Sequence, residues 1–389
     1  MSTRYFLANA SSNLAQFVSL IFLSLVMPHA EFGLVREFFA LFLVVATLSQ
    51  LGLSTSLITS WNQIENKFEM SVLISMCVAL ASWIFSFIYF DSVSLYLVTL
   101  SVILYSAPLV AAAVLQASSS HNRLLFFQNY PKILFYLTLM SMAVLRDIDF
   151  FLKIHIGLSI VIVAFLFSRM PKPSISYRKT RLEGDVVFVM SRSLVPFVLA
   201  ASSTLLQNFE FILLPDDIDE NELGSFAKAS LIFSGSVAML FFLQNRALSS
   251  LTAGELSRHG IARYSAKIFL ISSLIAMLTI SIVNFSQQFS SYLYFDYNPY
   301  IFYLVLFKLI VWSTYAVPGI LVYHLGYGFT SLSLALFPIL IATLIGYFDL
   351  VLSIEALLIS SALLMAFSSV IVNIVVFRLA FAKGKLSGN

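Results

Sequence analysis

Long apolar runs alternate with short polar or charged breaks along the whole chain. A helical residue advances about 1.5 Å and the hydrocarbon core of a bilayer is about 30 Å thick, so about 20 apolar residues are needed to cross it. The runs predict twelve transmembrane helices, six on each side of a basic central segment. They lie near residues 5–27, 37–59, 70–90, 93–117, 131–145, 151–168, 186–207, 224–248, 265–285, 299–320, 328–348 and 355–378.

The composition agrees with this pattern and excludes a water-soluble globular fold. Of the 389 residues, 60% are hydrophobic and 11% are charged, and the mean hydropathy is +0.94. A soluble fold cannot cover that much apolar surface. We therefore predict an all-α polytopic membrane protein with about 12 transmembrane helices in two six-helix lobes. The fifth run is short, and Lys153 and His155 interrupt the sixth, so the pattern leaves the boundaries of these two helices open.

Basic residues predict the orientation of the helices, because Lys and Arg accumulate in cytoplasmic loops. If the N-terminus is cytoplasmic, 16 of the 22 basic residues fall on the cytoplasmic side, and only Arg36, Arg146 and Lys153 fall on the other. An even number of helices then places both termini in the cytoplasm.

The break in the middle of the chain predicts a division into two lobes. The segment 169–185 carries Pro171, Pro173 and a run of basic residues, and it is the longest predicted cytoplasmic loop. We interpret it as a basic linker between an N-terminal lobe, 1–168, and a C-terminal lobe, 186–389. Its charge is explained by topology and by attraction to anionic lipid head groups.

An internal repeat supports two related lobes. Glu31-Phe-Gly33 opens the second predicted helix, and Glu222-Leu-Gly224 opens the eighth, close to half the chain length further on. Because six helices separate the copies, both enter the membrane in the same direction. Parallel repeats of this kind are typical of transporters whose substrate path lies between two bundles.

The same residues resemble a known family. Three N-terminal stretches and two later ones are similar to polysaccharide-repeat flippases of the Wzx type, within the multidrug/oligosaccharidyl-lipid/polysaccharide exporter superfamily. The stretches are Asn13-Leu-Ala-Gln16-Phe, Glu31-Phe-Gly33, Leu51-Gly-Leu-Ser-Thr-Ser-Leu-Ile58, Leu206-Gln-Asn208-Phe-Glu210-Phe-Ile-Leu-Leu and Glu222-Leu-Gly224-Ser-Phe. They cover roughly the first 60 residues and the region from about 186 to 235.

This resemblance implies a fold, an activity and partners. The implied fold has twelve helices in two six-helix lobes, as in the multidrug exporters of the superfamily, that open alternately to either side. The implied activity moves undecaprenyl-diphosphate-linked oligosaccharide units, such as O-antigen, across the bacterial inner membrane. A polysaccharide polymerase and a chain-length regulator are the implied protein partners, and no nucleic acid is expected. Members often carry an Asp followed by Arg or Lys where this chain has Glu210 and Phe211, so no role is transferred to a basic residue there.

Cations inside predicted helices are the first candidates for binding a diphosphate. A charge at mid-membrane costs on the order of 3 kcal/mol, so such residues are functional candidates. Lys308 is the deepest of them, and its alternative is a buried pair with Asp296 or Asp349. Arg192 suits a diphosphate because a guanidinium donates two parallel hydrogen bonds, and its alternative is to extend to the cytoplasmic interface.

Four further cations complete this set. The repeat aligns Lys228 with Glu37, beside Arg36, and these could form the outer end of a charged path. The alternative for Lys228 is an interfacial position or an ion pair with the acidic loop at 216–222. Arg123 and Arg246 lie at predicted cytoplasmic helix ends, where they could capture the diphosphate first or act only as topology signals.

Polar residues also line one face of the first predicted helix. Asn9, Asn13 and Gln16 follow helical spacing and predict either hydrogen-bonding groups in a sugar-binding cavity or contacts between helices, worth about 1 kcal/mol each or less.

Enzyme, cofactor and metal motifs are not found in the sequence. The five histidines, at 29, 121, 155, 259 and 324, show no ligand spacing, and there is no nucleophile elbow, P-loop or dinucleotide fingerprint. We expect a transporter that is not an enzyme and has no cofactor. Two alternatives remain, a cation-coupled multidrug exporter of the same superfamily and, with less support, a membrane glycan polymerase. The exporter commonly uses an acid in the first helix, which this chain lacks, and the polymerase needs a larger outside loop.

Overall fold

The computed structural model describes thirteen stretches of the chain, and helices, turns and short irregular connections make up all of them. No residue in these stretches forms a β-strand. They comprise residues 3–60, 63–64, 67–90, 95–117, 121–168, 182–214, 218–252, 258–288, 299–324, 336–337, 340–341, 344 and 353–379.

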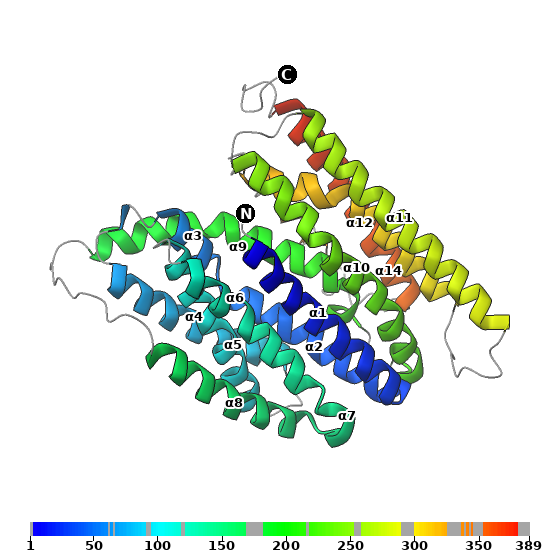
Figure 1. Cartoon of the computed structure of the whole chain (residues 1–389), viewed down its shortest axis with the longest axis horizontal. Helices are drawn as coiled ribbons and strands as arrows, with labels where there is room; N and C mark the ends of the chain where they lie inside the picture. Colours follow the sequence, from blue (N-terminus) through cyan, green and yellow to red (C-terminus); the bar gives the residue numbers. More distant parts are fainter. Residues whose placement is uncertain are drawn as a thin grey trace. The chain divides into compact units, whose positions relative to one another are not determined.

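The helices follow the apolar runs in order (Figure 1). The first half contains α1 (Thr3–Val26), α2 (His29–Ser49), α3 (Leu53–Ser60), α4 (Lys67–Tyr89), α5 (Leu95–Ala117), α6 (His121–Leu139), α7 (Met142–Leu145) and α8 (Ile148–Ser168). The second half contains α9 (Leu182–Ile212), α10 (Glu220–Thr252), α11 (Arg258–Gln288), α12 (Pro299–His324), α14 (Ile354–Ile374) and a π-helical turn, Val375–Leu379.

Eight helical segments in the described residues are long and apolar enough to cross a bilayer, so the chain is a multi-pass α-helical membrane protein. They lie in α2, α4, α5, α9, α10, α11, α12 and α14. The total of twelve helices and the lobe boundaries 1–168, 169–185 and 186–389 stay predictions, and most of the eleventh predicted helix, 328–348, lies outside the described residues.

Several predicted helix boundaries differ from the structure by a few residues, and those of the second and fifth helices differ most. The second helix was expected at 37–59, but α2 begins at His29 and a turn at Gln50–Gly52 separates it from α3. The early start places Glu31 and Arg36 inside the helix, where Arg36 is buried and has partners within the protein. The fifth helix was expected at 131–145, but α6 begins at His121, and Pro131 lies within it. In both helices, charged or proline residues that usually mark the end of a helix therefore lie inside it.

The chain forms two compact units. Unit 1 consists of Met27–Glu37 and Leu205–Asn389, with Met1, and unit 2 consists of Ser2–Val26 and Phe38–Thr204. Both boundaries at 37 and 204 fall inside helices, so α2 and α9 each contribute to both units.

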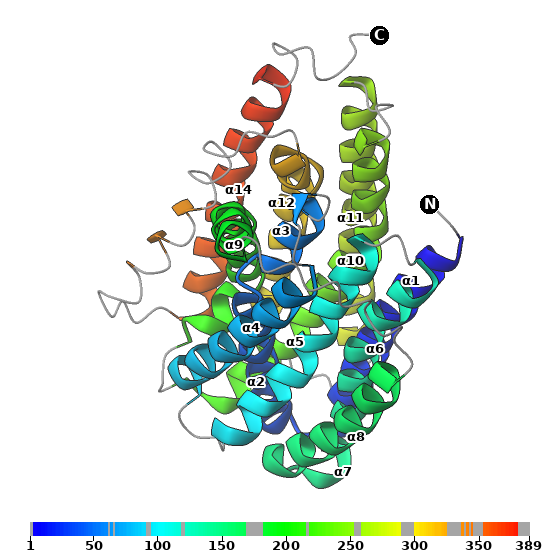
Figure 2. The same cartoon turned by 90° about the vertical axis from the view of Figure 1, so that its left-hand side faces the viewer.

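In unit 2, α5 packs against α3, α4, α6 and α8 (Figure 2). Aromatic side chains fill much of this packing. Phe42 stacks on Phe135 with ring centroids 4.4 Å apart, and Tyr105 meets both rings edge-on. His155, which interrupts the sixth apolar run, is buried beside Phe135 and lies 2.6 Å from the Ser101 hydroxyl. A hydrogen-bonded imidazole is thus accommodated in an apolar helix, because a buried polar group costs little when it is bonded.

In unit 1, α12 packs against α10, α11 and α14. The start of α2 meets the start of α10 at two glycines. A Cβ atom on Gly33 would lie 2.9 Å from the backbone nitrogen of Gly224, and a Cβ atom on Gly224 would overlap the backbone carbonyl of His29. The absence of side chains lets the two backbones touch, as is usual at close crossings of membrane helices. The Glu-x-Gly repeat is therefore also a physical contact between its two copies.

Helix positions agree with the predicted repeat. The starts of α2 and α10, at positions 29 and 220, are separated by the same interval as Gly33 and Gly224, and so are the starts of α4 and α11, at positions 67 and 258. The starts of α5 and α12, at positions 95 and 299, and of α8 and α14, at positions 148 and 354, are separated by slightly longer intervals. Four helices of the first half are therefore matched in the same order by four helices of the second half.

We expect Gly224→Ala to destabilise the protein, because its methyl group has no space between α10 and the first turn of α2. Inserting atoms into a packed contact typically costs about 1–3 kcal/mol. Thermal unfolding in detergent measures this loss. Gly157→Ala is the matched control, since a Cβ on Gly157 meets nothing within 4 Å. Equal stability of both variants would contradict the glycine crossing.

Candidate functional site

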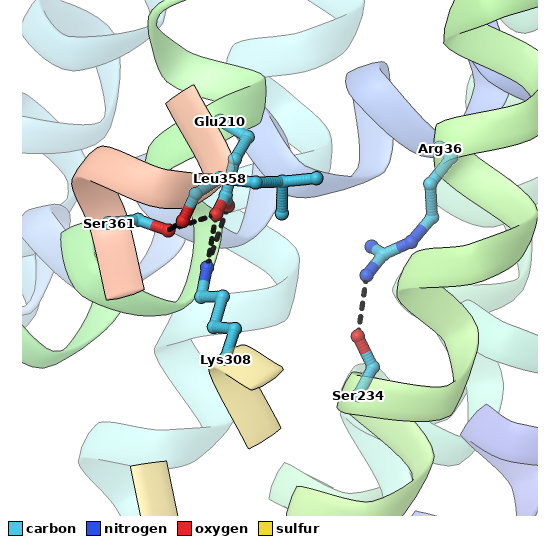
Figure 3. A network of polar contacts seen from close by, with 6 residues as sticks. All are labelled: Arg36, Glu210, Ser234, Lys308, Leu358 and Ser361. Carbon is cyan, nitrogen blue, oxygen red and sulfur yellow. Dashed lines mark hydrogen bonds and ion pairs between the residues drawn. The ribbon is translucent and has the colours of Figure 1, made fainter. Parts of the chain in front are cut away.

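An ion pair lies inside the apolar helices of unit 1. The ammonium of Lys308 on α12 donates to both carboxylate oxygens of Glu210 on α9, at 2.6 and 2.7 Å (Figure 3). Each residue is only 2% exposed. Both lie within segments long and apolar enough to cross the bilayer, Pro299–Gly319 and Gly184–Ile212. The charges are therefore paired with each other and removed from solvent.

A residue on a third helix also binds the Glu210 carboxylate. The hydroxyl of Ser361 on α14 donates to Oε1 of Glu210, and it also lies 3.1 Å from the carbonyl oxygen of Leu358 (Figure 3). Ser361 is fully buried. The carboxylate thus accepts hydrogen bonds from two different helices, which orients it and lowers the cost of its burial.

An aromatic ring lies beside the Lys308 ammonium. Its nitrogen lies 4.9 Å from the centre of the Phe233 ring on α10, and Phe233 in turn meets Trp312 nearly edge-on. A ring face attracts a cation, most strongly where water is excluded. Lys308 is therefore stabilised both by Glu210 and by the face of an aromatic ring.

A second buried cation lies in the same unit. Arg36 on α2 is 3% exposed, and its Nη2 donates to the hydroxyl of Ser234 on α10 at 2.7 Å (Figure 3). Its guanidinium lies 5.1 Å from the centre of the Phe211 ring, and Phe211 packs against Phe226. Glu210 and Phe211 are adjacent in sequence, so consecutive residues of α9 contact two different cations.

The charges of these groups act on each other. Arg36 repels the Lys308 ammonium, whereas Glu210 attracts it. Such interactions are strong in a low-dielectric interior, where a charge that loses its partner is very unfavourable. We call the buried residues Arg36, Glu210, Lys308 and Ser361, together with the partly buried Ser234, the buried polar cluster.

The other predicted site residues are placed differently. Arg192 is exposed on α9, with its guanidinium 4.1 Å from the centre of the Phe188 ring. Lys228 on α10 and Gln16 on α1 are half-buried. The side chains of Arg123, Arg246, Asn9 and Asn13 lie outside the part that the structure describes. The structure thus brings Lys308 and Arg36 into one unit and leaves Arg192 on the surface of the other.

Three members of the buried polar cluster were not predicted from the sequence. Glu210, Ser234 and Ser361 were assigned no role as partners, and the acids suggested for Lys308, Asp296 and Asp349, lie outside the described residues. One signal was present, because Glu210 is an acid within a long apolar run. Its partner could not be read from spacing, since Lys308 follows 98 residues later.

Metal ligands do not gather in the described residues, where no group of three or more His, Cys, Asp or Glu side chains could hold a metal ion. The buried polar cluster contains one carboxylate, two cations and hydroxyl groups. Chemically, each charged group of the cluster can bind a group of opposite charge, and it can exchange one such partner for another.

Comparison with known proteins returned no match, either from a scan against protein-family models or from a search of curated proteins.

We expect Lys308→Met to lower the free energy of unfolding by about 3–5 kcal/mol, because it leaves the Glu210 carboxylate buried without its cation. Glu210→Gln should also destabilise, through the unpaired ammonium. The double variant should be more stable than Lys308→Met, since both charges are gone. Denaturant unfolding in mixed micelles measures all three, and additive losses in the double variant would contradict the ion pair.

Proposed function

We propose that this protein is a flippase that moves undecaprenyl-diphosphate-linked oligosaccharide units, such as O-antigen, across the bacterial inner membrane by alternating access. Three features support this proposal: the multi-pass helical architecture, the repeated spacing of four helix starts, and the resemblance of the first 60 residues and of 186–235 to Wzx-type flippases.

The observation that carries the proposal is the buried polar cluster inside membrane-spanning helices. Ionisable residues within the bilayer are costly, and they are common where an ion or a charged substrate passes. Lys308 and Arg36 are two buried cations with a single buried carboxylate, Glu210, in direct contact with Lys308. Lysine and arginine side chains bind phosphate oxygens through charge-assisted hydrogen bonds, so opening the Lys308–Glu210 pair would supply a cation to the diphosphate.

The repeat suggests how such an opening would occur. In transporters with parallel repeats, two bundles rock against each other around a central site. Gly33 and Gly224 join the first turns of α2 and α10, and Arg36 and Ser234 join the same helices further along. In the orientation predicted from basic residues, these contacts lie toward the periplasmic end. We propose that they close that end while the cytoplasmic side is open.

The hydrogen bonds of Glu210 favour this proposal over a cation-coupled drug exporter. Such an exporter needs a membrane carboxylate that can accept a cation from solution. Here the two oxygens of Glu210 are already bound by Lys308, and one also accepts from Ser361. In this structure the carboxylate is therefore already paired with a cation of the protein itself.

We expect Arg192→Ala to reduce export of the lipid-linked unit about tenfold or more, since losing a charge-assisted hydrogen bond costs about 1.5–3 kcal/mol. Arg192 is exposed, so the variant should insert normally. The assay is surface polysaccharide, and accumulation of the lipid-linked precursor, in a strain lacking the native protein. Lys153→Ala, another exposed cation, is the matched control.

The double variant Lys308→Met/Glu210→Gln tests the buried pair in the same strain. It removes both charges, so neither charge is left unpaired. We therefore expect a normal amount of the protein in the membrane and a loss of export of the lipid-linked unit. Normal polysaccharide in both this variant and Arg192→Ala would remove these residues from the mechanism. If the strain that lacks the protein makes a normal amount of surface polysaccharide and is more sensitive to drugs, that result would favour the multidrug exporter.

A further inference from the structure

Helix α9 is shared between the two compact units. Its residues Leu182–Thr204 belong to unit 2, and its residues Leu205–Ile212 belong to unit 1. The two parts of one helix are therefore anchored in different surroundings.

The first part is held by the α2–α3 turn and by α3. The Ser56 hydroxyl donates to the carbonyl oxygen of Val189 at 2.7 Å, and Val189 is buried in an apolar cluster with Leu53 and Leu57. Gly52, at φ +65°, lies so close to the backbone of α9 at Ser193 that a Cβ atom would overlap it. Any other residue would also be strained at this φ. These contacts fix the first part of α9 to unit 2.

The last part is held by the buried polar cluster. Glu210 binds Lys308 on α12 and Ser361 on α14, and its neighbours Phe209 and Phe211 are both buried. Withdrawing this segment would uncover an ionic pair inside the membrane. These contacts fix the last turns of α9 to unit 1.

Between the two anchors the helix bends. Asn208 has φ −117° and ψ 18°, whereas a regular α-helix has neither value, and the helix is kinked there. The preceding stretch, Ser202–Thr204, consists of residues with low helix propensity, and Pro196 removes a backbone donor. Bends in long helices have such local causes, which lie here in the sequence of α9.

The other described crossings between the units are different. Between Val26 and Met27 the chain passes through the turn that ends α1. Between Glu37 and Phe38 it passes through α2, which is one continuous helix there. Of these crossings, α9 is the one where a helix itself bends close to the boundary.

We propose that Asn208 is the hinge of α9, about which the segment anchored by Glu210 changes direction relative to the segment anchored at Val189 and Ser193. A hinge needs a few residues that absorb a change of φ and ψ between two rigid attachments, and α9 provides this arrangement. As the moving part of a transport cycle, the hinge rests on the proposed function.

Distances between spin labels on the two units test the hinge. The chain has one cysteine, so Cys77→Ser gives a background for labels at Val161 on α8 and Met277 on α11, each 67% exposed. The distance distribution is measured in lipid nanodiscs. We expect Asn208→Ala to narrow the distribution, because alanine favours the straight helix, and Asn208→Gly to broaden it, because glycine disfavours the straight helix. The population of the bent helix should differ about fivefold between the two variants.

Met190→Ala and Met190→Gly are the matched controls, since Met190 is exposed within the anchored first part of α9. They impose the same change in helix propensity away from the bend, and both should leave the distribution unchanged. Equal distributions for Asn208→Ala and Asn208→Gly, or equal broadening by Met190→Gly, would overturn the hinge. If Asn208→Ala fails to fold, the comparison of Asn208→Gly with the parent decides.

The distance measurement is independent of polysaccharide export. Altered distances in a protein whose loss leaves surface polysaccharide normal would keep the hinge and reject the flippase. Unaltered distances together with the expected export defects would keep the flippase and reject the hinge.

Discussion

A charge inside hydrocarbon must find its partner within the protein, and much of unit 1 follows from this constraint. Lys308 and Glu210 form an ion pair, and Ser361 donates a further hydrogen bond to the carboxylate. The requirement brings together α9, α12 and α14, which are far apart in sequence. An apolar contact could be replaced by another apolar contact, but a buried carboxylate accepts few substitutes for its cation. The ion pair therefore gives these helices a specific arrangement.

Close backbone approach is the second constraint on unit 1. Gly33 and Gly224 allow α2 and α10 to touch, and Arg36 and Ser234 connect the same two helices. In a bilayer, apolar side chains contact lipid tails as favourably as they contact each other, so packing and hydrogen bonds decide which helices associate. Small residues and buried polar groups are therefore the positions where this sequence specifies its contacts.

These constraints bear on function through α9. One end of this helix is bound to unit 2 and the other to the buried polar cluster, with a bend at Asn208 between them. A transporter needs rigid attachments, to transmit movement, and a limited number of flexible positions. The carboxylate of the cluster that is proposed to release a cation to a diphosphate thus lies on the helix that is proposed to change direction.

The sequence alone determined that this chain is an all-helical, multi-pass membrane protein, because the hydropathy of a single apolar run is a local property. It also identified the repeated glycines, and it identified Lys308 because a charge in an apolar run stands out, whereas Arg36 was expected just before the second helix. The tertiary structure decided their partners and the true start of α2. Glu210 is 98 residues from Lys308, and Ser234 is 198 residues from Arg36, so no spacing rule connects them. Pairing across such separations depends on which helices pack together, which only the folded chain defines.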